Sequence, residues 1–212
     1  MKRNMSYAEL ESLFLQMKIG DEAAFSQIYK ATFETQYYMA YRMLHDSYLA
    51  EEVVQDTYTT FYQNMGAINN AKAIVSYLNS VNYHACLKAK LRIQRETPSD
   101  FENMESILED ESPGSNPVKQ VLDKETSDEL SLALDQLPDH LRSVLLLRYS
   151  SNMRIQDIAD AMSISPRTVK RYLSRAAADL KEIMKPSSSG GLRTGGPLLS
   201  LLLSLIPFVL KR

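Results

Sequence analysis

The residues between positions 167 and 175 could bind nucleic acid, because basic and hydroxyl side chains recur there at helical spacing. They are Arg167, Thr168, Lys170, Arg171, Ser174 and Arg175. Guanidinium and ammonium groups bind phosphates, and arginine also pairs with base edges in the major groove. Ser165 is a good N-cap and Pro166 suits the first helical position, so the positive end of the helix would lie beside the first of these side chains. We therefore expect a DNA contact at the start of this helix.

The helix that carries these side chains also has an apolar side, and a second amphipathic helix precedes it. The apolar stripe of the basic helix is Val169, Tyr172, Leu173 and Ala176. The stripe of the earlier helix is Ile155, Ile158, Ala159 and Met162. A short helix, a tight turn and a second helix with a basic outer face are typical of a helix-turn-helix DNA reader. A solvated basic face on an ordinary amphipathic helix is the alternative.

The composition is that of an ordinary soluble protein, without the excess of basic charge that proteins binding DNA alone usually have. Hydrophobic residues make up 44% of the chain and charged residues 24%, with a net charge of −2 and a pI near 6.0. Residues 96–128 hold ten acidic and two basic groups, whereas residues 129–185 hold seven acidic and nine basic groups. We infer that the DNA affinity is shared with a partner protein.

The sequence contains no residues with the spacing of a catalytic or metal site. Cys86 is the single cysteine, and no histidine stands at ligand spacing from it or from another histidine. There is no glycine-rich phosphate loop and no nucleophile elbow. We therefore predict no metal, no cofactor and no enzymatic activity. The lone cysteine and the absence of a signal peptide predict a reducing, cytoplasmic location.

The apolar spacing predicts helices and no sheet, since no segment alternates with a period of two. We expect two helices within residues 6–44, with Asp21 as the N-cap of the second, and a third from about Tyr48 to Met65. A fourth helix is expected over residues 71–95. Its predicted inward-facing residues are Ile74, Tyr77, Leu78, Val81 and Leu87.

Composition divides the chain into four parts. Residues 1–95 form a first helical domain, and residues 96–128 form an acidic linker too poor in apolar faces to bury a core. Residues 129–185 form a second helical domain, and residues 186–212 are a Gly/Ser spacer followed by an apolar tail. The predicted fold class is all-α, with two small helical domains joined by an acidic flexible linker.

Two stretches resemble a known family. The run LDQLPDHLRSVLLLRYSSNMRIQDIADAMSISPRTVKRYLSRAAADL resembles the fourth conserved region of bacterial sigma-70 factors, with its Leu-Pro opening, Arg142 and the Ile158-Ala159 pair. The run LAEEVVQDTYTTFYQNM resembles the second region. The chain is therefore similar to the compact extracytoplasmic-function (ECF) group, which keeps only these two regions. The resemblance covers residues 20–95 and 129–184.

The resemblance implies a promoter-recognition subunit of bacterial RNA polymerase, with core polymerase and promoter DNA as partners and an anti-sigma factor as a further candidate. The implied polymerase-docking residues, whose side chains can accept charge-assisted hydrogen bonds from arginine, are Glu51, Glu52, Gln55 and Asp56. The implied minus-ten residues are Asn69, Asn70, Lys72, Tyr77, Lys88, Lys90, Arg92 and Arg95. The implied minus-thirty-five residues are those at positions 167–175 described above. A solvated helix face is the alternative for the docking residues, and a core position is the alternative for Tyr77.

Four positions depart from the family pattern. Tyr77 stands where the family usually has Trp, and His84 and Lys88 stand where it usually has Asn and Asp. Ser163 stands at the usual turn glycine. These departures bear on promoter preference and on strand opening rather than on the fold.

The C-terminal tail has no counterpart in the resemblance. The apolar run of residues 197–210 is 14 residues long, about 21 Å as a helix, whereas a bilayer core of roughly 30 Å needs about 20 residues. We expect it to dock on the protein's own domains, on a partner or on a membrane surface. The location we expect is cytoplasmic and nucleoid-associated, and docking on a membrane surface would add peripheral membrane association. Two other functions stay open: a stand-alone helix-turn-helix regulator and a tail-anchored interaction module.

Overall fold

The structure is a computed structural model that describes residues 5–68, 73–96 and 124–184. Within these ranges every regular element is a helix, which confirms the predicted all-α class. The chain divides into two compact units, Met1–Ser115 and Asn116–Arg212. Residues 97–123 of the predicted acidic linker and the predicted apolar tail lie outside the described residues, and residue 96 of that linker is the last residue of α4.

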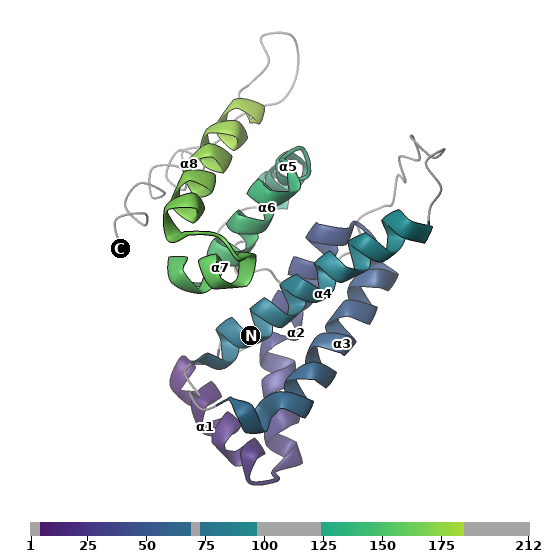
Figure 1. Ribbon diagram of the computed structural model, residues 1–212, viewed down its shortest axis with the longest axis vertical. Helices are drawn as coiled ribbons and strands as arrows, with labels where there is room; N and C mark the ends of the chain where they lie inside the picture. The colour runs from purple at the N-terminus through teal and green to yellow at the C-terminus, as the bar shows by residue number, and fades with distance from the viewer. Residues whose placement is uncertain (1–4, 69–72, 97–123, 185–212) are drawn as a thin grey trace. The chain divides into compact units, whose positions relative to one another are not determined.

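The first unit is a bundle in which α2, α3 and α4 pack against one another and α1 packs mainly on α2 (Figure 1). Its helices are α1 (Tyr7–Lys18), α2 (Glu22–Leu44), α3 (Ser47–Asn64) and α4 (Ile74–Glu96), with a 3-10 turn at Met65–Ala67 after α3. Amphipathic helices of this length gain most of their stability by burying one face against neighbours. The bundle therefore fixes which face of each helix stays exposed.

Polar side chains set the helix starts in this unit. Ser6 and Glu9 form a capping box at α1, in which Ser6 Oγ accepts from the Glu9 N–H at 3.2 Å. Asp21 Oδ1 accepts from the Ala23 N–H at 2.9 Å, which confirms Asp21 as the N-cap of α2. Asp46 caps α3 in the same way. These caps explain why the turns fall where the sequence predicted them.

A small polar cluster lies inside the core of the first unit, where α2 packs against α4. Gln36 of α2 donates to Asn79 Oδ1 at 2.6 Å, and Asn82 Nδ2 donates to Gln36 Oε1 at 2.8 Å. The Cys86 thiol beside them is fully buried, and burial raises its pKa to about 12. Because each buried polar atom in this cluster has a partner, the amides specify how α4 lies against α2.

The inward position predicted for Leu87 is wrong, because the structure leaves 37% of that side chain exposed. Asn79, Asn82 and Cys86 occupy the buried side of α4 instead. The polar cluster shifts the buried stripe of this helix away from the one that apolar spacing alone predicts. Leu78 and Ile74 are buried as predicted.

The second unit contains α5 (Lys124–Asp135), α6 (Asp139–Leu145), a π-helical turn at Leu146–Ser150, α7 (Ile155–Met162) and α8 (Pro166–Ile183). Helix α5 begins inside the segment predicted to be linker. Helices α6 and α7 both pack on α8 (Figure 1). The predicted helix-turn-helix is thus the α7–α8 pair.

The start of α8 has the predicted cap. Ser165 Oγ accepts from the Thr168 N–H at 3.1 Å, and Pro166 occupies the first turn. Val169, Leu173 and Ala176 are buried as predicted, whereas Tyr172 is only half-buried. The buried stripe orients α8 so that its other side faces solvent.

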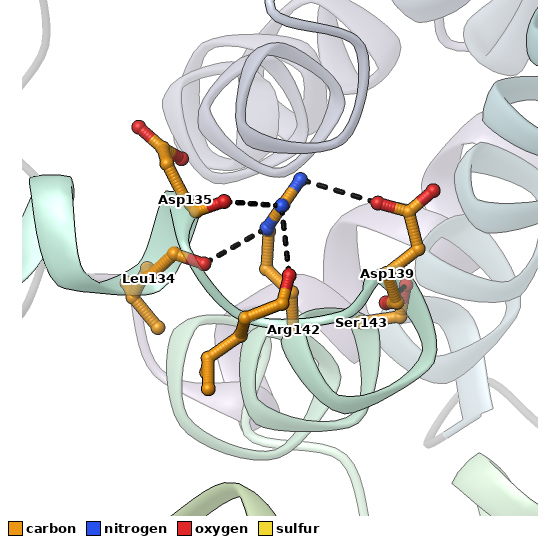
Figure 2. Close-up of polar contacts among 6 residues, drawn as sticks. Leu134, Asp135, Asp139, Arg142 and Ser143 are labelled. Carbon is orange, nitrogen blue, oxygen red and sulfur yellow. Dashed lines mark hydrogen bonds and ion pairs between the residues drawn. The ribbon is translucent and has the colours of Figure 1, made fainter. Parts of the chain in front are cut away.

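Arg142 of α6 is a buried residue whose guanidinium caps the C-terminus of α5. Its Nε donates to the Leu134 carbonyl at 2.9 Å, and its Nη2 donates to the carbonyls of Asp135 at 2.8 Å and Leu137 at 2.9 Å. Figure 2 shows the guanidinium between the end of α5 and the carboxylate of Asp139, whose Oδ1 lies 3.4 Å from Nη1. The last carbonyls of a helix have no hydrogen-bond donor within the helix, and the Arg142 guanidinium provides donors for those of Leu134 and Asp135.

Replacing Ser163 with Gly should stabilise the second unit by about 0.5–1 kcal/mol. Ser163 ends α7 with φ 54° and ψ 41°, a left-handed conformation that costs a residue with a Cβ about 1–2 kcal/mol. Part of the gain is lost because glycine has more freedom in the unfolded chain. Thermal unfolding should show a rise of a few degrees for Ser163→Gly and none for Ser163→Ala. An unchanged or lower melting temperature for the glycine variant would contradict this account of the turn.

Candidate nucleic-acid and polymerase interface

The first turns of α8 present a basic face to solvent. The exposed side chains on it are Arg167, Lys170, Arg171, Ser174 and Arg175. Thr168 is half-buried, and its hydroxyl lies 2.9 Å from Ser165 Oγ. The N-terminal N–H groups of the helix add a partial positive charge beside these side chains. A surface of this kind attracts phosphate and can place arginine forks against base edges.

Two residues of this face have partners within the second unit. The Arg171 guanidinium lies 5.6 Å from the centre of the Tyr172 ring, whose other neighbour is the His140 ring at 4.9 Å. Arg175 Nε donates to both carboxylate oxygens of Asp179, at 2.9 and 3.0 Å. The Arg175 charge is therefore partly neutralised in the free protein, whereas the Arg171 charge is held over an aromatic ring at the surface.

Helix α3 presents an acidic face. Its exposed side chains include Glu51, Glu52, Gln55 and Asp56, at the one-three-one spacing that places them side by side. The opposite face is buried through Val53, Val54 and Phe61. Because the buried face fixes the rotation of the helix, the acidic face is held outward in a constant geometry. It offers carboxylate oxygens to basic groups on another protein.

The C-terminal half of α4 carries the basic residues predicted for DNA. Lys88, Arg92 and Arg95 are exposed, whereas Lys90 is half-buried. The positive charge of Lys90 partly offsets the rise that burial causes in the pKa of Cys86. Tyr77 is half-buried, with its ring centre 6.3 Å from that of Phe61. The structure thus gives Tyr77 one side in the core and one side toward solvent.

One contact joins the α3 and α4 sites. Arg92 Nη1 lies 2.7 Å from Glu52 Oε1, and Arg92 Nη2 lies 2.9 Å from Glu52 Oε2. The hydrogen bonds from Arg92 are the main cause that lowers the pKa of the Glu52 carboxyl. A residue predicted to bind polymerase and a residue predicted to bind DNA therefore bind each other.

Comparisons with known proteins identify the family of the second unit and relatives of the whole chain. The second unit matches the family model described as Sigma-70, region 4 over residues 127–180. The ECF RNA polymerase sigma factor SigW of Bacillus subtilis (strain 168) is 23% identical over 178 residues, which is 80% of this chain and 94% of SigW. The chain belongs to the ECF group of the sigma-70 family.

Two solved structures have the same fold. CnrH in complex with the cytosolic domain of CnrY has a TM-score of 0.58 at 16% identity. The match covers 85% of this chain and 99% of the chain in that structure. The sigma factor RpoE in complex with the anti-sigma factor NepR, from Bartonella quintana, has a TM-score of 0.54 at 24% identity. It covers 76% of this chain and 96% of its own.

Three of the residues predicted for the minus-ten surface lie between Ile68 and Ala73 in the sequence. Asn69, Asn70 and Lys72 lie outside the described residues. The residue just before them, Ile68, is held by α1, because Lys18 Nζ donates to the Ile68 carbonyl at 3.0 Å. Lys18 was not predicted as a site residue, and only its position in the last turn of α1 marks it in the sequence. This contact ties the end of α1 to Ile68, the last described residue before the gap.

Of the four family departures, two lie at the surface of α4, whereas Tyr77 is half-buried. His84 and Lys88 are both exposed on α4, and His84 packs edge-on against the Tyr83 ring with centroids 5.7 Å apart. Neither substitution disturbs the core. Within the described residues, no group of three or more His, Cys, Asp or Glu could hold a metal ion, and no helix is long and apolar enough to cross a membrane.

Proposed function

We propose that this chain directs bacterial RNA polymerase to promoters and supports transcription initiation, and that its two units divide the work. The observation that carries this function is the exposed basic face of a capped helix-turn-helix in a chain whose other unit presents a fixed acidic face. The first surface suits DNA and the second suits a basic protein surface. Sigma factors in general are not enzymes, so the phosphodiester bonds would be formed by the polymerase.

Residue roles follow from charge and exposure. Glu51, Glu52, Gln55 and Asp56 would accept hydrogen bonds from basic side chains of the polymerase. Lys88, Arg92 and Arg95 would hold phosphates near the minus-ten element, with Tyr77 offering an aromatic face to an unstacked base. The α8 face would read the minus-thirty-five element, with its first turn nearest the groove.

Further partners and location belong to the same proposal. The solved relatives CnrH and RpoE are each bound to another protein, and NepR is named as an anti-sigma factor. We propose that an anti-sigma factor also binds this chain. The site of action would be the nucleoid in the cytoplasm. The apolar tail at residues 197–210 would dock on the protein's own domains, and the alternative is that it docks on a membrane surface.

Lys170→Ala and Arg171→Ala should each reduce promoter-dependent transcription by about 5- to 30-fold, because each removes a contact worth about 1–2 kcal/mol. Both side chains are exposed, so folding should not change. Lys181→Ala removes an exposed cation from the last turn of the same helix and should have little effect. The measurement is multiple-round transcription with core polymerase at several salt concentrations, in which the Lys170 variant should lower the salt slope by about one unit. Equal activity of all three variants would show that this face of α8 does not bind promoter DNA.

A stand-alone helix-turn-helix regulator is the rival function. Such a protein would bind a specific duplex tightly without polymerase, and its activity would not depend on the α3 acidic face. Gel-shift assays without polymerase separate the two functions.

A further inference from the structure

The contact between Glu52 and Arg92 links the two binding surfaces of the first unit. It joins α3 to α4 across forty residues of sequence, with two parallel hydrogen bonds of 2.7 and 2.9 Å. Both side chains are about half exposed, at 46% for Arg92 and 49% for Glu52. The pair is therefore accessible to an incoming partner on either side, and neither residue is fixed by burial.

The two-bond geometry has a chemical consequence for each residue. An arginine fork that faces both oxygens of a carboxylate directs two of its five donors at that carboxylate and presents fewer to a phosphate. The bound carboxylate also neutralises the guanidinium charge, which is the property that attracts DNA. The Glu52 carboxylate likewise has its two oxygens facing Arg92 rather than another protein.

We propose that this ion pair is a clasp that withholds Arg92 from DNA in the free protein, and that binding of Glu52 by a basic group of the polymerase releases Arg92 to a phosphate. The inference rests on the proposed function, since it assigns Glu52 to polymerase and Arg92 to DNA. It makes DNA binding by the first unit depend on polymerase docking. It also fits the low net charge of a chain whose DNA affinity is shared with a partner.

The clasp predicts that Glu52→Gln tightens the binding of the free, full-length protein to DNA. Exposed ion pairs contribute little, so the gain should be about two- to fivefold at low salt. Glu51→Gln is the matched control, because Glu51 is exposed on the same helix and its substitution removes the same charge. A general loss of negative charge would affect both variants alike, whereas release of Arg92 would affect Glu52→Gln alone.

The experiment measures fluorescence anisotropy of a labelled, mixed-sequence duplex of about 30 base pairs without polymerase. The expected result is tighter binding by Glu52→Gln than by Glu51→Gln, with the difference lost when Arg92→Gln is added to each variant. Equal affinities of the two single variants, or a difference that persists with Arg92→Gln, would overturn the clasp. Thermal unfolding of each variant checks that α3 and α4 stay packed.

Polymerase is absent from this assay, so its outcome is independent of whether Glu52 binds polymerase. Retention of core polymerase by the same variants is measured separately. Loss of the clasp effect with intact polymerase binding would reject the inference alone. A clasp effect in a protein that never binds polymerase would reject the proposed function alone.

Discussion

Replacing Glu52 and Asp56 together with Lys should abolish binding of this sigma factor to core RNA polymerase, with a loss of at least about 100-fold. Both carboxylates lie on the exposed face of α3, and charge reversal turns attraction to a basic surface into repulsion. Like charges brought together in an interface cost several kcal/mol, and 1.4 kcal/mol corresponds to a factor of ten. Co-purification with core polymerase and its titration by anisotropy are the measurements.

The control for this variant is Glu11→Lys with Glu22→Lys, which reverses two charges on α1 and α2 instead of α3. It should keep polymerase binding within a few-fold of the unmodified chain. Asp56→Lys alone leaves the Glu52–Arg92 pair intact and should lose about tenfold. If the α3 double variant binds polymerase as well as the control does, α3 is not the docking helix.

Replacing Arg142 with Met should destabilise the second unit by about 3–5 kcal/mol. The guanidinium is buried and donates to the carbonyls of Leu134 and Asp135 in α5 and of Leu137 in the turn that follows, and methionine leaves these carbonyls without those donors. Each buried group that loses a partner costs about 1–3 kcal/mol. Domains of this size have only about 5–15 kcal/mol of stability, so much of it would be lost. Unfolding in urea, followed by circular dichroism, should show a distinct early transition.

Arg148→Met is the matched control for Arg142→Met. Arg148 lies half-buried in the π-helical turn, where its Nη1 donates to the Met153 carbonyl at 2.7 Å. Its replacement should cost about 1–1.5 kcal/mol, well below the cost at Arg142. Equal destabilisation by both substitutions would show that the Arg142 contacts do not hold the end of α5.

The helices and the basic face of α8 could be predicted because they depend on local rules. Ser165, Pro166 and the stripe of Val169 and Leu173 are short-range signals, and the structure agrees with them. The exposure of the acidic face of α3 follows in the same way from the apolar residues beside it. Such patterns need only the periodicity of a helix and the chemistry of its ends.

Contacts between distant segments could not be predicted. The buried amides of Asn79 and Asn82 have a partner on α2, Gln36, that lies 43 and 46 residues earlier in the sequence. Apolar spacing does not reveal this contact and therefore predicted Leu87 on the buried side. The pairing of Glu52 with Arg92 also depends on how two helices pack. Arg142 belonged to the family resemblance, but its role at the end of α5 is visible only in three dimensions.

The most direct test of the account is transcription with purified core polymerase on genomic DNA fragments of the encoding organism, with and without this chain, followed by sequencing of the RNA 5′ ends. The account predicts new, discrete start sites that share upstream sequence and require both components. These starts should disappear with Glu52→Lys/Asp56→Lys and weaken with Arg171→Ala. An unchanged set of start sites, together with tight sequence-specific binding of the chain to duplex DNA in the absence of polymerase, would contradict it.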